Sequence, residues 1–155
     1  MDAVRRQHQR DAYAAFLTTA NTYSSQTEWR ACFEEARAAV GISAFFEDRR
    51  EEVEQRAIRI RASVQIDPVR AAAAVVSLEG PERIAALAED VVRQASQVRL
   101  DAREGNGPGA GWWSALLDGR QPDPEPPAHL RLTNAINAFT MAARSHLNGS
   151  KASGT

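Results

Sequence analysis

The sequence lacks the residues that stabilise secreted proteins and anchor membrane proteins. Cys32 is the only cysteine, so an intramolecular disulfide is excluded and an oxidising compartment gains no support. A membrane helix needs about 20 consecutive apolar residues, and no segment supplies them. The first residues, MDAVRRQHQRD, contain no signal-peptide core. We therefore expect a cytoplasmic protein with no membrane span in this chain.

An excess of charge of one sign is also lacking. The chain has 19 basic and 20 acidic residues and a formal net charge of −1, so no overall field attracts nucleic acid or anionic lipid. Lys151 is the only lysine, and the other basic residues are arginines. Recognition of phosphate would explain this preference for arginine, but a GC-rich genome explains it more simply, and the abundant alanine agrees.

Catalytic and metal-binding motifs are missing. The three histidines, His8, His129 and His146, offer neither the i,i+4 spacing of a zinc site nor the Glu-x-x-His pairs of a di-iron bundle. The glycine-rich segment 104–111 is not followed by the Gly-Lys-Ser/Thr of a phosphate-binding loop. We expect no enzymatic activity, no metal and no cofactor.

The chain does contain helical periodicity along nearly its whole length. Apolar residues recur at spacings of three and four, and no segment alternates as a strand would. This pattern predicts an all-α fold, an antiparallel bundle of four principal helices with short accessory helices. One domain would cover residues 1–148, with a disordered tail at 149–155. The expected helices cover about residues 2–23, 27–40, 43–64, 68–79, 81–103 and 128–148, with a short helical turn near 112–117.

The segment from Val69 to Val98 predicts the helical hairpin around which the other helices would pack. Gly80 is placed to end the first helix in a positive-φ conformation, and Pro81 to occupy the first position of the second. An apolar stripe then follows at helical spacing: Ile84, Leu87, Ala88, Val91, Ala95 and Val98. Upstream, Ser24 and Ser25 are expected to interrupt the first helix, with Ser25 or Thr27 capping the next.

Two groups of residues are candidate binding sites. Trp112 and Trp113 are adjacent, and neighbours on a helix point about 100° apart, so both rarely face one core. They would close one end of the bundle, which is the favoured interpretation, or anchor a protein partner. One basic cluster has no acidic residue within it and is a candidate nucleic-acid contact: Arg5, Arg6 and Arg10. The basic clusters at 49–50 and 56–61 lie among acidic residues, which would repel phosphates.

Three segments resemble a poorly characterised family of helical proteins from high-GC bacteria. The family patterns are R-x-A-Y-x-x-F-L, matched by residues 10–17, V-x-L-x-G-P, matched by 76–81, and F-x-x-A-A-R-x-x-L, matched by 139–147. These are packing and turn motifs, so the resemblance implies a helical bundle and assigns no functional residues. Members of this family often carry a membrane span before the first motif, which would place such an anchor upstream of Met1.

These observations favour a non-enzymatic module that acts by protein–protein contact, with a protein partner or a second copy of the chain. The alternative function is a nucleic-acid-associated regulator that uses Arg5, Arg6 and Arg10. It is the less favoured explanation of these arginines, because a solvated helix surface accounts for them more simply. A bundle with an interior small-molecule pocket is a third, weaker hypothesis.

Overall fold

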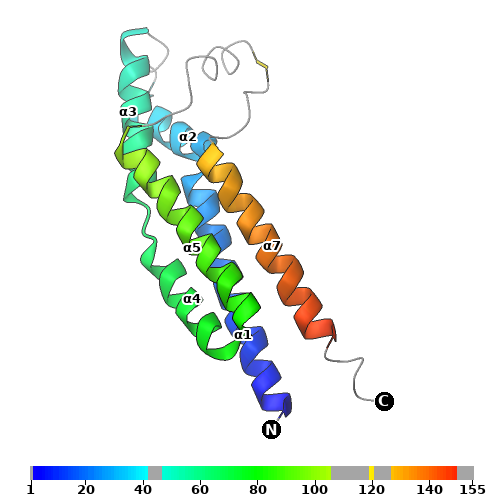
Figure 1. Ribbon diagram of the computed structural model, residues 1–155. Helices are drawn as coiled ribbons and strands as arrows, with labels where there is room; N and C mark the ends of the chain where they lie inside the picture. The colour runs from blue at the N-terminus through cyan, green and yellow to red at the C-terminus, as the bar shows by residue number, and fades with distance from the viewer. Residues whose placement is uncertain (1, 42–46, 106–118, 121–126, 150–155) are drawn as a thin grey trace.

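The protein is a bundle of α-helices, as predicted (Figure 1). The computed structural model describes residues 2–41, 47–105, 119–120 and 127–149, and no strand occurs among them. The helices of these ranges are α1 (Asp2–Thr27), α2 (Trp29–Val40), α3 (Glu47–Ser63), α4 (Asp67–Glu79), α5 (Glu82–Arg103) and α7 (Pro127–Gly149). The start of the third helix at Ser43, the Trp112–Trp113 segment and the tail beyond Gly149 lie outside the described residues.

Four helices, α1, α4, α5 and α7, enclose the larger hydrophobic core. Consecutive members of this set run in opposite directions, and α7 returns beside α1 and α5 (Figure 1). Each helix contributes its apolar stripe, and burial of one such side chain contributes about 1.5–3 kcal/mol. The largest fully buried side chains here are Tyr13 and Phe16 of α1, Val69 and Val76 of α4, Val91 and Val98 of α5, and Leu132 and Phe139 of α7.

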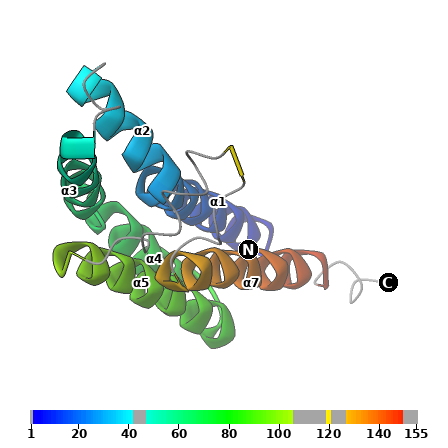
Figure 2. The ribbon, with the colours of Figure 1, turned by 90° about the horizontal axis from the view of Figure 1, so that it is seen from above.

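The accessory helices α2 and α3 pack on each other at one end of the bundle, as both ribbon views show (Figure 2). Their contact buries a second, smaller apolar cluster around Trp29, with Phe33 from α2 and Val53 from α3. Gly41 ends α2 with a φ of 76°, which a glycine adopts without a steric penalty. The predicted end of this helix is therefore confirmed.

Helix α1 runs past the predicted interruption at Ser24 and Ser25 and ends at Thr27. Tyr23 is buried in the core, and its hydroxyl donates a hydrogen bond to the Ala95 carbonyl at 3.0 Å. The buried Thr27 hydroxyl in turn donates to the Tyr23 carbonyl at 2.8 Å, within the helix. The prediction was wrong because these contacts outweigh the weak helix propensity of the serines. Neither Ser25 nor Thr27 caps α2, which Glu28 precedes without a side-chain cap.

The corner between α4 and α5 lies where it was predicted, but its geometry differs. Gly80 has φ −95° and ψ 165°, an extended conformation, and Pro81 precedes the first residue of α5 instead of occupying it. The predicted positive φ is therefore wrong. Glycine is needed here for space, since a Cβ would lie 2.9 Å from both the Tyr13 hydroxyl oxygen and the Val76 carbonyl oxygen.

Candidate basic pocket

The three arginines predicted as a basic cluster line one hollow at the end of the bundle. There the first turns of α1, the α4–α5 corner and the last turn of α7 come together (Figure 1). The hollow measures about 430 Å³ and is open to solvent. We call it the basic pocket, and its lining residues are Arg5, Arg6, Gln9, Arg10, Pro81, His146 and Leu147.

Gln9 fixes α1 against the corner. Its side chain is buried, and its Nε2 donates a hydrogen bond to the Glu79 carbonyl at 2.6 Å. The last carbonyl groups of a helix have no hydrogen-bond partner within the helix. The bond from Gln9 therefore gives a partner to the carbonyl group of Glu79, the last residue of α4. The arginines before and after Gln9 are therefore carried on a helix whose position is set by a contact across the bundle.

Tyr13 connects the same corner to α7. Its ring centroid lies 5.9 Å from that of Phe139 and 6.3 Å from that of His146. The Tyr13 hydroxyl is buried against Gly80 and has no hydrogen-bond partner among the described residues. Packing against Tyr13 places His146, on the last turn of α7, beside the pocket.

Arg5, Arg6 and Arg10 form no ion pair with a carboxylate in the part of the chain that the structure describes. Asp11, which directly follows Arg10, accepts a hydrogen bond from Gln7 at 2.8 Å. Guanidinium groups carry several N–H donors in a planar fork that fits carboxylate or phosphate oxygens. The basic pocket therefore offers unpaired donors for an anionic group.

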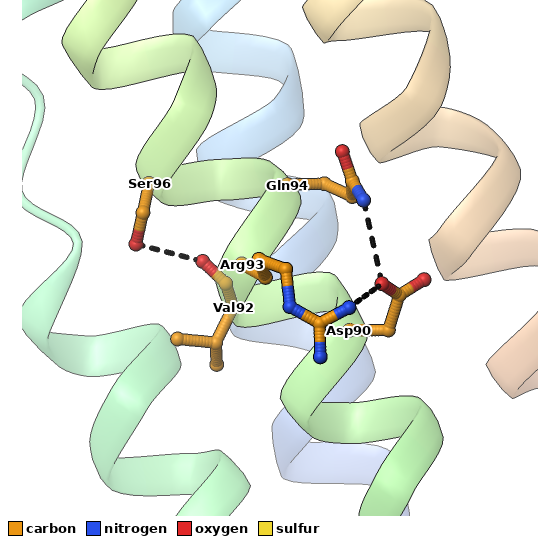
Figure 3. Close-up of polar contacts among 5 residues, drawn as sticks. All are labelled: Asp90, Val92, Arg93, Gln94 and Ser96. Atoms are coloured by element: carbon orange, nitrogen blue, oxygen red, sulfur yellow. Dashed lines mark hydrogen bonds and ion pairs between the residues drawn. The ribbon is translucent and has the colours of Figure 1, made fainter.

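A second hollow, between α5 and α7, differs in its charges. It measures about 590 Å³ and is lined by Arg93 and Asp90 among other residues. Figure 3 shows that the Asp90 carboxylate accepts hydrogen bonds from Arg93, at 2.9 Å, and from Gln94, at 3.3 Å. Arg93 is already paired with Asp90, and Arg83 is the other arginine that lines this hollow. With one arginine outside a described ion pair, against three in the basic pocket, this hollow is the weaker candidate for an anion site.

The remaining candidates from the sequence give no site. Trp112 and Trp113 lie outside the described residues, so the partner surface predicted there stays a prediction. Within the described ranges, no group of His, Cys, Asp and Glu side chains could hold a metal ion. None of the helices in those ranges is long and apolar enough to cross a bilayer. His129 is buried, with Nε2 2.8 Å from the Ser24 carbonyl oxygen.

Sequence reasoning did not assign Gln9, Pro81 and His146 to a binding site. Gln9 carried one usable signal, since it lies four residues after Arg5 and three after Arg6 and thus shares their side of a helix. Pro81 and His146 come from distant parts of the chain, and only the folded bundle brings them to the arginines.

No family model matches the chain, and comparisons with curated proteins and with solved structures likewise produced no match. The resemblance to the helical family of high-GC bacteria therefore stays a prediction. The functional argument rests on the pocket itself.

The two tyrosines predict how stability depends on alkaline pH. Burial raises the pKa of Tyr13 above 10.0, and burial raises the pKa of Tyr23 more than Arg61, Arg99 and Arg70 lower it. The folded chain thus holds its phenolic protons more tightly than the unfolded chain. We expect stability to be unaffected by these groups below pH 10 and to fall as the pH rises above it.

Absorbance at 295 nm and circular dichroism, recorded together during an alkaline titration, measure this dependence. Tyrosinate should form only as the helices unfold, whereas the chain in urea should titrate at the ordinary pKa of tyrosine. Ionisation of either tyrosine near pH 10 in a fully helical protein would contradict the burial described here.

Proposed function

We propose that this protein is a non-enzymatic interaction module whose basic pocket binds an acidic segment of a protein partner. The observation that supports this function is the convergence of Arg5, Arg6 and Arg10 on one open hollow without a described carboxylate as partner. Contacts of Gln9 and Tyr13 set the walls of that hollow. The predicted cytoplasmic location belongs to the same proposal.

The chemistry of the pocket suits binding more than catalysis. Arginine keeps its proton at neutral pH, so the three guanidinium groups can attract and orient an anion but cannot exchange protons with it. Gln9 uses its amide to hold the Glu79 carbonyl. The hollow of about 430 Å³ that these arginines line has room for a few side chains of a bound segment.

An acidic protein segment fits the charge distribution better than nucleic acid does. A nucleic-acid surface usually carries an extended basic face, because each neutralised phosphate adds a small contribution to affinity. Here the net charge is −1, and three arginines without an ion pair among the described residues line one hollow at the end of the bundle, whereas others, such as Arg59 and Arg131, lie apart from it. A compact group of donors matches a short cluster of carboxylates, each of which an arginine can bind in bidentate fashion.

Loss of two pocket arginines should abolish most of this binding. We expect Arg6→Gln/Arg10→Gln to weaken binding of a short polyglutamate peptide by about tenfold or more, since each bond to a charged group contributes about 1.5–3 kcal/mol. Isothermal titration calorimetry at low ionic strength measures the affinity. Arg131→Gln, at an exposed position of α7, is the matched control and should bind as the unchanged protein does.

Two further probes separate the alternatives. Inorganic phosphate that binds as tightly as the peptide would indicate a small-anion site. If duplex DNA binds more tightly than the peptide, and Arg6→Gln/Arg10→Gln weakens DNA binding as it weakens peptide binding, the nucleic-acid regulator would be favoured. Peptide binding that Arg131→Gln weakens as much as Arg6→Gln/Arg10→Gln would contradict a role for the pocket.

A further inference from the structure

The basic pocket has two neighbouring hollows on the surface of the bundle. We call the hollow of about 590 Å³ between α5 and α7 the α5–α7 groove. A smaller hollow of about 170 Å³, which we call the junction, lies where α5 begins and α7 ends (Figure 1). The junction shares Pro81 and His146 with the basic pocket, and it shares Arg83, Ala142 and Ser145 with the α5–α7 groove. The three hollows therefore follow one another, with the junction in the middle.

Short apolar side chains form much of the α5–α7 groove. Ala86 of α5 and Ala138 and Ala142 of α7 line it, and their small size leaves space between the two helices. Leu87 and Met141 add larger apolar surface, and Met141 is 71% exposed. The groove therefore offers apolar surface that a bound segment could cover, and covering it would be favourable.

Positive charge decreases from the basic pocket to the far part of the groove. The basic pocket contains three arginines without an ion pair among the described residues. Arg83 lines both the junction and the groove, and it also has no ion pair within those residues. Farther along the groove, Arg93 is paired with Asp90 (Figure 3). Carboxylates are therefore favoured at the pocket end and apolar side chains along the groove.

We propose that the acidic segment of the partner continues into apolar residues, which bind the α5–α7 groove while the carboxylates occupy the basic pocket. This inference rests on the proposed function, because the pocket would hold one end of the segment. His146 and Ala138 are eight residues apart in α7, which is about 12 Å along the helix axis. An extended chain covers about that distance in four residues. The apolar residues should therefore lie within about four positions of the carboxylates.

A peptide fits these hollows better than an anionic lipid does. The basic pocket and the α5–α7 groove are both open to solvent. An acyl chain in an open groove would leave part of its apolar surface in water, which is unfavourable. A peptide can instead turn its backbone polar groups and polar side chains toward solvent. Arg83 and Ser145, which line the junction, can donate hydrogen bonds to its carbonyl groups.

Isothermal titration calorimetry with designed peptides tests the inference. The peptides EEEGLSL and LSLGEEE join three glutamates to two leucines in the two possible chain directions, and EEEGSSS lacks the leucines. We expect one of the leucine peptides to bind about tenfold more tightly than EEEGSSS, because the groove removes leucine side chains from water.

A variant of the groove locates the added affinity. Ala138→Gln/Met141→Gln makes two exposed positions of α7 polar, and both residues lie outside the basic pocket. It should remove the gain of about tenfold that the leucines provide and leave polyglutamate binding intact. Leu130→Gln, at a position of α7 that is 48% exposed and outside the three hollows, is the matched control and should keep the gain. Circular dichroism checks that both variants fold.

The outcomes separate this inference from the proposed function. If all three peptides bind equally, and polyglutamate binding still depends on Arg6 and Arg10, the inference is overturned and the proposed function stands. If polyglutamate does not bind the unchanged protein, both are overturned. A gain that Ala138→Gln/Met141→Gln leaves intact would show that the leucines bind elsewhere. Tighter binding of decyl phosphate than of either leucine peptide, lost in the same variant, would replace the peptide by an anionic lipid.

Discussion

Replacing Phe139 with alanine is expected to lower the free energy of unfolding by about 3–5 kcal/mol. Phe139 is fully buried, and its ring centroid lies 4.6 Å from that of Phe16 and 5.9 Å from that of Tyr13. Alanine would remove both aromatic contacts and leave a cavity between α1 and α7. Since small domains have a total stability of about 5–15 kcal/mol, this loss would be a large part of it.

Urea denaturation followed by circular dichroism measures this loss of stability. Met141→Ala is the matched control on the same helix, because Met141 is 71% exposed and should change stability little. A Phe139→Ala variant as stable as Met141→Ala would show that the aromatic cluster is not the centre of the core.

Gly80→Ala is expected to destabilise the protein by about 1–3 kcal/mol through overpacking. The backbone at Gly80 has φ −95°, which alanine adopts without strain, so the cost is steric. The added Cβ would lie 2.9 Å from the Tyr13 hydroxyl oxygen and from the Val76 carbonyl oxygen. Tyr13 cannot move aside easily because its ring is buried against Phe139.

A double-mutant cycle isolates this contact. Tyr13→Phe removes the hydroxyl that the alanine would meet, and that hydroxyl has no hydrogen-bond partner among the described residues. Gly80→Ala should therefore cost less in the Tyr13→Phe background than in the unchanged protein, as measured by urea denaturation. Equal costs in the two backgrounds would show that the clash with Val76 dominates, or that Tyr13 and Gly80 do not touch.

The helices could be predicted from the sequence because their apolar stripes have the period of the α-helix. The stripe from Ile84 to Val98 shows this: Ile84, Val91 and Val98 are all buried in α5. The corner at Gly80 and Pro81 could be located for a similar reason, since both residues interrupt a helix. Such signals are local, because each is formed by residues that lie within a few helical turns of one another in the sequence.

The details that sequence reasoning missed depend on contacts between distant segments. The last turn of α1 is held by Tyr23, whose hydroxyl reaches Ala95 of another helix. The glycine at position 80 is required by the approach of Tyr13, not by its own φ angle. Neither requirement can be read from the neighbours of these residues in the sequence.

The candidate site was predictable only in part. Arg5, Arg6 and Arg10 were recognised as a cluster because they lie close together in the sequence. Their convergence on a hollow with His146 depends on the antiparallel return of α7, which periodicity predicts only in general terms. A cluster interpreted mainly as solvated helix surface is thus, in the folded chain, the lining of a pocket.

The central claim is that the basic pocket binds acidic groups, and side-chain NMR tests it most directly. Spectra of the arginine Nε–Hε groups, recorded with and without polyglutamate peptide, report which guanidinium groups the peptide contacts. We predict large shifts for Arg5, Arg6 and Arg10, and none for Arg93, which is paired with Asp90. Shifts spread evenly over all the arginines, or confined to residues outside the pocket, would contradict the proposed function.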